Sequence, residues 1–120
     1  MGESEEVEKV YKLCLVHKFS AAHFLPGHKG KCRNLHGHTW KVQVDIRVND
    51  LIEGMVVDFG DIKAVIDSVD HVYLNNVLEN PTAENIAEYI YNRLKDDDFI
   101  DLEVTVWESE NASISYKEGR

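Results

Sequence analysis

Two histidines separated by a single residue, His36 and His38, give the clearest chemical signal in the chain. Side chains two residues apart on a strand point to the same side, so both imidazoles would project together while Gly37 leaves the other side unobstructed. The positions that continue this side are apolar, and polar rings there need partners. His23 would join them if the preceding segment pairs with this one. Three histidines with an open fourth position are typical of catalytic zinc; the alternative is ordinary histidines hydrogen-bonded in a loop.

A cysteine, Cys32, precedes His36 by four residues and lies between Lys31 and Arg33. It could be an inert buried thiol, a fourth zinc ligand or a reactive thiolate. The flanking positive charges argue against burial and favour the thiolate. A thiolate beside a metal-bound substrate could accept a proton or act as a nucleophile. The second cysteine, Cys14, lies in the middle of an apolar segment, and we interpret it as structural.

Two further signals involve carboxylates. In the dipeptide Asp70-His71, the carboxylate could orient the imidazole or hold its proton, although such a pair also suits a helix end or a surface. Glu108 ends an alternating segment and falls on its apolar side. A carboxylate there either lies at an exposed strand end or binds a partner that offers two N–H donors in one plane.

These residues must be positioned by strands. From 36 to 48 the even positions continue as apolar residues after the histidines and the odd positions are polar or glycine, which predicts a strand with one face on a core. An apolar segment over 10–23 predicts a preceding strand of less regular alternation. Shorter alternating segments over 101–108 and 112–117 predict two more strands.

Two helices are predicted between the strand pairs. Apolar residues recur at helical spacing from Ile62 to Val69. A second stripe runs from Ala83 to Leu94, with Thr82 as its N-cap and Glu84 near the positive helix end. The order β-β-α-α-β-β predicts an α+β fold, a four-stranded antiparallel sheet with both helices on one face.

Composition limits the function classes. The chain has 120 residues, so we expect one domain over 1–120. Its 22 acidic and 13 basic residues give a net charge of −9, which argues against nucleic acid or an anionic membrane as partner. Two cysteines make no disulfide framework, and no signal peptide or membrane span is visible, so we expect a cytoplasmic protein. His17 and His28 have no evident partner in the sequence.

Taken together, these motifs resemble the 6-pyruvoyl tetrahydropterin synthase and 6-carboxy-tetrahydropterin synthase family. The resemblance extends over nearly the whole chain and implies the tunnelling fold, in which subunits assemble into a hexamer of two trimers with active sites between subunits. Such sites would overcome the limit that a short chain sets on the depth of a cleft. The motifs that carry the resemblance are Phe19–His23, Cys32–His38, Gly54–Phe59, Asp70–Asn75, Pro81–Asn85 and Trp107–Glu108.

The resemblance also implies roles for individual residues. Cys32 would be the catalytic base, with Asp70 and His71 as relay partners supplied by a neighbouring subunit. Glu108 would hold the pterin ring through its amino group and ring N–H, and could share in the relay. Thr82 and Glu84 would line or support the pterin pocket. The implied zinc ligands are His23, His36 and His38.

The substrate implied is 7,8-dihydroneopterin triphosphate, which a zinc-dependent lyase would convert to 6-carboxy-5,6,7,8-tetrahydropterin for queuosine (7-deazapurine) biosynthesis. Triphosphate and acetaldehyde would be released. The compact chain and the retention of Cys32 favour this branch over the folate-type variants. Alternatives are a 6-pyruvoyl tetrahydropterin synthase, which only eliminates triphosphate, and a zinc-binding assembly protein without turnover. The basic residues Lys29, Lys31 and Arg33 could attract the triphosphate despite the acidic total.

Overall fold

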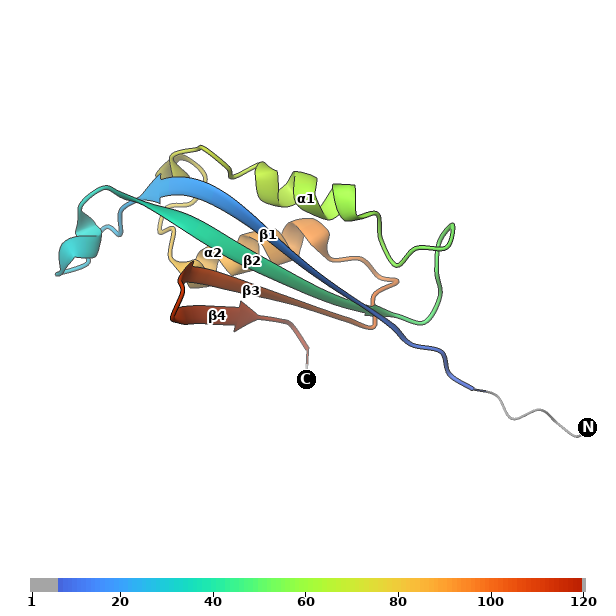
Figure 1. The fold of residues 1–120 in the computed structure, drawn as a ribbon. Helices are drawn as coiled ribbons and strands as arrows, with labels where there is room; N and C mark the ends of the chain where they lie inside the picture. Colours follow the sequence, from blue (N-terminus) through green and yellow to red (C-terminus); the bar gives the residue numbers. More distant parts are fainter. Residues whose placement is uncertain (1–6, 120) are drawn as a thin grey trace, which may run out of the picture.

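A computed structural model describes residues 7–119 as one antiparallel sheet with two helices (Figure 1). The element order confirms the predicted α+β arrangement. Two short 3₁₀ turns, η1 (Lys31–Arg33) and η2 (Leu74–Asn76), lie in the connections. The strands and helices are β1 (Tyr11–His23), β2 (His36–Val48), α1 (Phe59–Asp67), α2 (Ala83–Leu94), β3 (Asp101–Ser109) and β4 (Ala112–Tyr116).

The strands follow the order β1-β2-β3-β4, and each neighbouring pair is antiparallel. β1 and β2 pair along their whole lengths, from Tyr11 opposite Val48 to His23 opposite His36. The predicted hairpin is therefore confirmed. Its register brings the end of β1 to the beginning of β2, where the histidines lie.

One face of the sheet carries the core. Trp40, Val42 and Val44 of β2 are fully buried, as the alternation predicted. α1 packs on β1, while α2 packs on β3 and β4, so both helices cover this face (Figure 1). Most of the buried helical residues match the predicted stripes: Ile62 and Ile66 of α1, and Ile86, Ala87 and Ile90 of α2. Tyr91 of α2 is buried as well, although it lies outside the predicted stripe.

The segment after α1 runs along the outer edge of β1. The His71 N–H donates to the Ser20 carbonyl at 2.6 Å, and Ala22 forms a parallel bridge with Tyr73. This contact fixes the position of Asp70-His71 beside the strand that ends at His23. Over residues 7–119, none of the helices is both long enough and apolar enough to cross a membrane.

Candidate metal centre and active site

The imidazoles of His23, His36 and His38 converge at the end of the β1–β2 hairpin. His23 lies opposite His36 in the strand register, and His38 lies opposite Ala21. The ring centroids are 4.5 Å apart for His23 and His36, 4.7 Å for His36 and His38, and 5.2 Å for His23 and His38. One donor atom from each ring, together with a carboxylate oxygen of Glu108, falls within 4.8 Å of all the others. The predicted grouping of the histidines is therefore present.

Backbone carbonyls orient two of the three rings. Nδ1 of His23 lies 2.7 Å from the Pro81 carbonyl, and Nδ1 of His36 lies 2.7 Å from the Asn34 carbonyl. Because a carbonyl can only accept, each Nδ1 carries the proton and donates it, which leaves the lone pair on Nε2. Histidines that bind metals are commonly held in this way by their other nitrogen.

The third ring, His38, is favoured in its neutral form. Burial lowers the pKa of His38, and the effect of burial outweighs the opposing attraction of the Glu108 carboxylate. The Nε2 atoms of His23 and His38 are buried and have no hydrogen-bond partner among the residues that the structure describes. Buried polar atoms normally have one, so these atoms fit a bound ion. Neutral imidazole nitrogens suit zinc and neighbouring transition metals, and the residues present fit such an ion.

Trp40 packs against two of the three imidazoles. Its ring meets those of His23 and His38 edge to face, at centroid distances of 5.0 and 5.3 Å. Trp40 is fully buried, and its Nε1–H donates to the Ala21 carbonyl at 3.4 Å. This packing separates the polar cluster from the apolar core.

Cys32 lies in η1, partly exposed, and is not one of the clustered donors. The structure therefore does not support its interpretation as a fourth ligand, and its partial exposure argues against the inert buried thiol. The Leu25 N–H donates to the Cys32 carbonyl at 2.6 Å, which closes the loop between β1 and β2.

Cys14 is exposed on the sheet rather than packed in the core. Partial desolvation, followed by the hydrogen bond and charge of Asp45, raises the pKa of the Cys14 thiol.

Asp70 and His71 form the predicted pair. One carboxylate oxygen of Asp70 accepts the Ser20 N–H at 2.8 Å, and the other lies 3.0 Å from Nδ1 of His71. The Ser20 N–H, and then His71, lower the pKa of Asp70. The His71 side chain is 81% exposed. In the described part of the chain, no hydrogen bond or ion pair joins this pair to Cys32.

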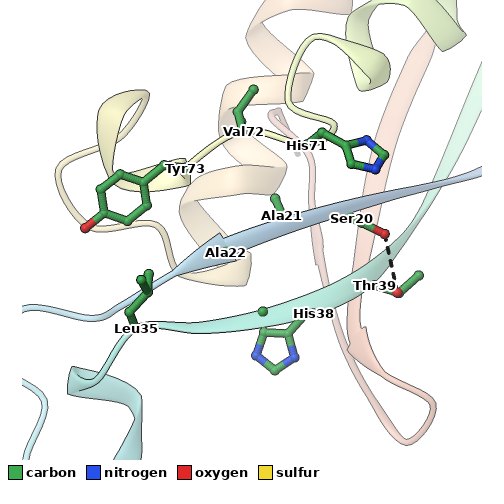
Figure 2. Close-up of a pocket in the computed structure, with 10 residues that line it drawn as sticks. Ser20, Ala21, Ala22, Leu35, His38, Thr39, His71, Val72 and Tyr73 are labelled. Carbon is green, nitrogen blue, oxygen red and sulfur yellow. Dashed lines mark hydrogen bonds between the residues drawn. The ribbon is translucent and has the colours of Figure 1, made fainter.

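A cavity of about 690 Å³ lies along the β1 edge beside this pair. Figure 2 shows His71 and Tyr73 on the loop that passes β1, while His38 projects from β2 away from His71. Ser20 and Thr39 face each other across the two strands, with their hydroxyl oxygens 3.4 Å apart. Within one chain, His71 thus borders an open surface instead of facing the histidine cluster.

Glu108 joins the histidines. Its Oε2 lies 3.4 Å from Nε2 of His23 and 3.5 Å from Nε2 of His38, and its side chain is 36% exposed. The sequence left a solvent-exposed strand end and a binding role equally open. The structure brings the carboxylate to the histidine cluster while leaving part of it accessible.

Thr82 and Glu84 lie at the beginning of α2. The Thr82 hydroxyl accepts the Asn85 N–H at 3.1 Å, which confirms the predicted N-cap. Glu84 is exposed in the first turn. Neither belongs to the clustered metal donors, and their part in a pterin pocket remains a prediction. The residue that sequence reasoning missed here is Pro81, whose carbonyl orients His23.

The two unassigned histidines have local partners. Nε2 of His17 lies 2.7 Å from an Asp67 carboxylate oxygen at the end of α1. Nδ1 of His28 accepts the Gly30 N–H at 2.9 Å. Both contacts lie outside the histidine cluster, so these residues stabilise neighbouring segments.

Comparison with known proteins points to one family. The family model described as 6-pyruvoyl tetrahydropterin synthase matches residues 12–119. The 6-carboxy-5,6,7,8-tetrahydropterin synthase of Haemophilus influenzae is 34% identical over 91% of this chain and all of its own length. The enzyme of the same name from Synechocystis is 43% identical over 65% of this chain and 70% of its own. The solved structure of Caenorhabditis elegans 6-pyruvoyl tetrahydropterin synthase matches with a TM-score of 0.75 at 28% identity, covering 95% of this chain and all of that one.

Proposed function

Because the chain belongs to the 6-pyruvoyl tetrahydropterin synthase family, we propose that it is a zinc-dependent lyase acting on 7,8-dihydroneopterin triphosphate. The products are 6-carboxy-5,6,7,8-tetrahydropterin, triphosphate and acetaldehyde, for use in 7-deazapurine biosynthesis. The observation that carries the metal-dependent chemistry is the convergence of the three imidazoles at the end of the β1–β2 hairpin. The names of the similar enzymes from Haemophilus influenzae and Synechocystis support the carboxy branch.

His23, His36 and His38 would hold the zinc ion. Neutral imidazoles leave the positive charge of the ion intact, and a zinc ion supplies a Lewis acid that makes nearby hydroxyl groups more acidic. Hydrogen bonds from Nδ1 to the carbonyls of Pro81 and Asn34 orient two of the rings, so that their Nε2 atoms are the ones available to the ion.

Cys32 would accept the proton from the substrate side chain, and Asp70 and His71 would assist it. The Asp70 carboxylate accepts from Nδ1 of His71, which leaves Nε2 able to take up or return a proton. A proton moved between adjacent carbons in this way converts a hydroxyl-bearing carbon to a ketone and allows triphosphate to leave. Glu108 would accept from the amino group and ring N–H of the pterin.

We propose that the protein acts as a hexamer of two trimers. Within residues 7–119, β1 and β4 form the two edges of the sheet, and an edge strand presents backbone groups that a second copy can pair with. His71 is largely exposed, and no hydrogen bond or ion pair within the described residues joins it to Cys32, so a neighbouring subunit could bring the two together. Light scattering of the purified protein tests the hexamer, and a monomeric mass for fully active protein would contradict it.

We also propose that the reaction takes place in the cytoplasm. Both cysteines are free, and a free thiol at Cys32 persists best in a reducing compartment. Fractionation of cells that express the protein from its own gene tests this. Enrichment in an oxidising compartment would contradict it.

The decisive experiment supplies zinc-loaded protein with 7,8-dihydroneopterin triphosphate. Product is identified by mass spectrometry, and acetaldehyde and triphosphate are measured in parallel. We expect equal amounts of both from the wild type, and acetaldehyde release slowed by about 10²–10⁴-fold in the Cys32→Ala variant. A product that keeps its three-carbon side chain would instead identify a 6-pyruvoyl tetrahydropterin synthase. Full zinc binding without turnover would identify a non-catalytic zinc-binding protein.

A further inference from the structure

Glu108 lies at an irregularity of the sheet. Trp107 pairs with Ser113 and Ser109 pairs with Ala112, so the register between β3 and β4 shifts across Glu108. Regular pairing of β2 with β3 also ends at Trp107, opposite Lys41. A bulge redirects the side chain of the extra residue, and bulges are frequent beside active sites. Glu108 thus lies where the regular pairing of β3 ends, with its carboxylate near the histidines.

The distances from Glu108 to the histidines are longer than those of typical hydrogen bonds. Its Oε2 is 3.4 Å from Nε2 of His23 and 3.5 Å from Nε2 of His38, whereas an N–H···O bond has a donor–acceptor distance of about 2.7–3.2 Å. Neither nitrogen has a hydrogen-bond partner among residues 7–119. In a tetrahedral zinc site with bonds of about 2.0–2.2 Å, neighbouring donor atoms lie about 3.3–3.5 Å apart. The observed spacing is therefore that between two ligands of one ion.

The lone pairs at this point also fit a cation. Nδ1 of His23 donates to Pro81, so in the neutral ring Nε2 of His23 is an acceptor, and it lies 3.4 Å from the acceptor oxygen of Glu108. The His23 side chain is fully buried. An ion between two such lone pairs converts their repulsion into attraction.

We propose that Oε2 of Glu108 is the fourth metal ligand when no substrate is bound. The inference rests on the metal site of the proposed function but not on its substrate. The resting site is closed by four protein ligands. An incoming oxygen ligand must displace the carboxylate, which is 36% exposed and therefore has space to move. The released carboxylate is then free to accept hydrogen bonds from N–H groups of the incoming molecule. Glu108 therefore couples the entry of that molecule to the opening of a coordination position on the ion.

The test uses cobalt(II) as a probe, because its visible absorption depends on the number and geometry of its ligands. Metal-free wild-type protein, Glu108→Gln and Glu108→Ala are titrated with cobalt, and their zinc affinities are measured by competition with a chromophoric chelator. Glu110→Gln is the matched control, since Glu110 is an exposed carboxylate two residues away in the β3–β4 turn. Circular dichroism of the metal-free variants verifies that each is folded.

We expect both Glu108 variants to bind zinc at least about tenfold more weakly than wild type, with a changed cobalt spectrum. Azide is the second probe: it should bind the cobalt form of Glu108→Ala more tightly, because the fourth position is then held only by water. Glu110→Gln should match wild type in all three measurements. If Glu108→Ala and wild type had equal zinc affinities, equal spectra and equal azide affinities, Glu108 would not be the fourth metal ligand. The three-histidine metal site would not be contradicted by that result. Wild-type protein that binds neither metal would contradict the metal site of the proposed function as well.

Discussion

Nδ1 of His23 donates to the carbonyl oxygen of Pro81 at 2.7 Å, and this contact joins the end of β1 to the turn before α2. The two residues are separated by 58 positions in the chain. The contact fixes which nitrogen of His23 is available to a metal. It also makes the fold and the metal centre depend on the same side chain.

Substitution of His23 should therefore differ from substitution of His36. Both His23→Ala and His36→Ala should lose most of their zinc, measured by elemental analysis. His23 is fully buried, so His23→Ala leaves the Pro81 carbonyl without its partner and should lower the free energy of unfolding of the metal-free protein by about 1–3 kcal/mol. His36 is only half-buried and should have a much smaller effect. Full zinc content in His36→Ala would disprove the three-histidine site.

The two cysteines provide a matched pair. Cys32→Ala should retain zinc and lose turnover by about 10²–10⁴-fold, as expected when a general base is removed. Cys14→Ala should retain both, because Cys14 is exposed on the sheet and outside the histidine cluster. Zinc content and acetaldehyde release are measured on each variant. Loss of zinc from Cys32→Ala would instead identify Cys32 as a ligand.

Thr82 should act mainly through helix capping. Thr82→Ala removes the acceptor for the Asn85 N–H and should destabilise the protein by about 1 kcal/mol, measured by urea unfolding. Thr82→Ser keeps the hydroxyl and should restore stability. Glu84→Gln, on the exposed first turn, should change stability by much less. If Thr82→Ser bound substrate normally while Thr82→Ala did not, despite equal stability, the hydroxyl would belong to the pterin pocket.

Asp70 should give a pH-dependent contribution to stability. The Ser20 N–H and His71 hold the pKa of Asp70 below 3.8, so folding favours the ionised carboxylate. The stability advantage of wild type over Asp70→Asn should be complete above that value and disappear as the pH falls through the lower pKa of the folded protein. Thermal unfolding of the metal-free proteins measures it. The exposed Asp97→Asn serves as control, and a pH-independent advantage for Asp70 would contradict the argument.

The basic residues before the histidines should steer the anionic substrate. Lys29 and Lys31 are exposed in the loop between β1 and β2, although the whole chain carries a net charge of −9. Replacing both with Gln should raise KM several-fold at low salt and much less at high salt, because salt screens exposed charges. Lys63→Gln, which removes an exposed charge on α1, is the control. A salt dependence of KM unchanged from wild type would exclude steering by this loop.

The sequence was most informative where apolar residues recur at the spacing of a strand or a helix, because that spacing predicts which side of the element is buried. Alternation over 36–48 predicted both the strand β2 and the side on which Trp40 and the histidines lie, because the side-chain period of a strand is fixed. Thr82 was recognised as a cap because its type and the helical stripe agreed. These features depend on local chemistry alone.

Other contacts could not be predicted from the neighbouring residues in the sequence. The Pro81 carbonyl is a backbone group that every residue possesses, so nothing in the sequence distinguishes it as the partner of His23. The pairing of His17 with Asp67 joins residues 50 positions apart and requires the packing of α1 on β1. Alternation placed Glu108 on the apolar side of its strand, but its closeness to the histidines depends on the pairing of β2 with β3, which alternation does not reveal.

The bond between His23 and Pro81 has a kinetic consequence. The proline ring restricts its own backbone torsion, and the imidazole that its carbonyl orients is fully buried. An arriving ion therefore meets at least one donor that is already held in place, which lowers the conformational entropy that its capture costs. We therefore expect metal uptake to require little rearrangement of the His23 side chain.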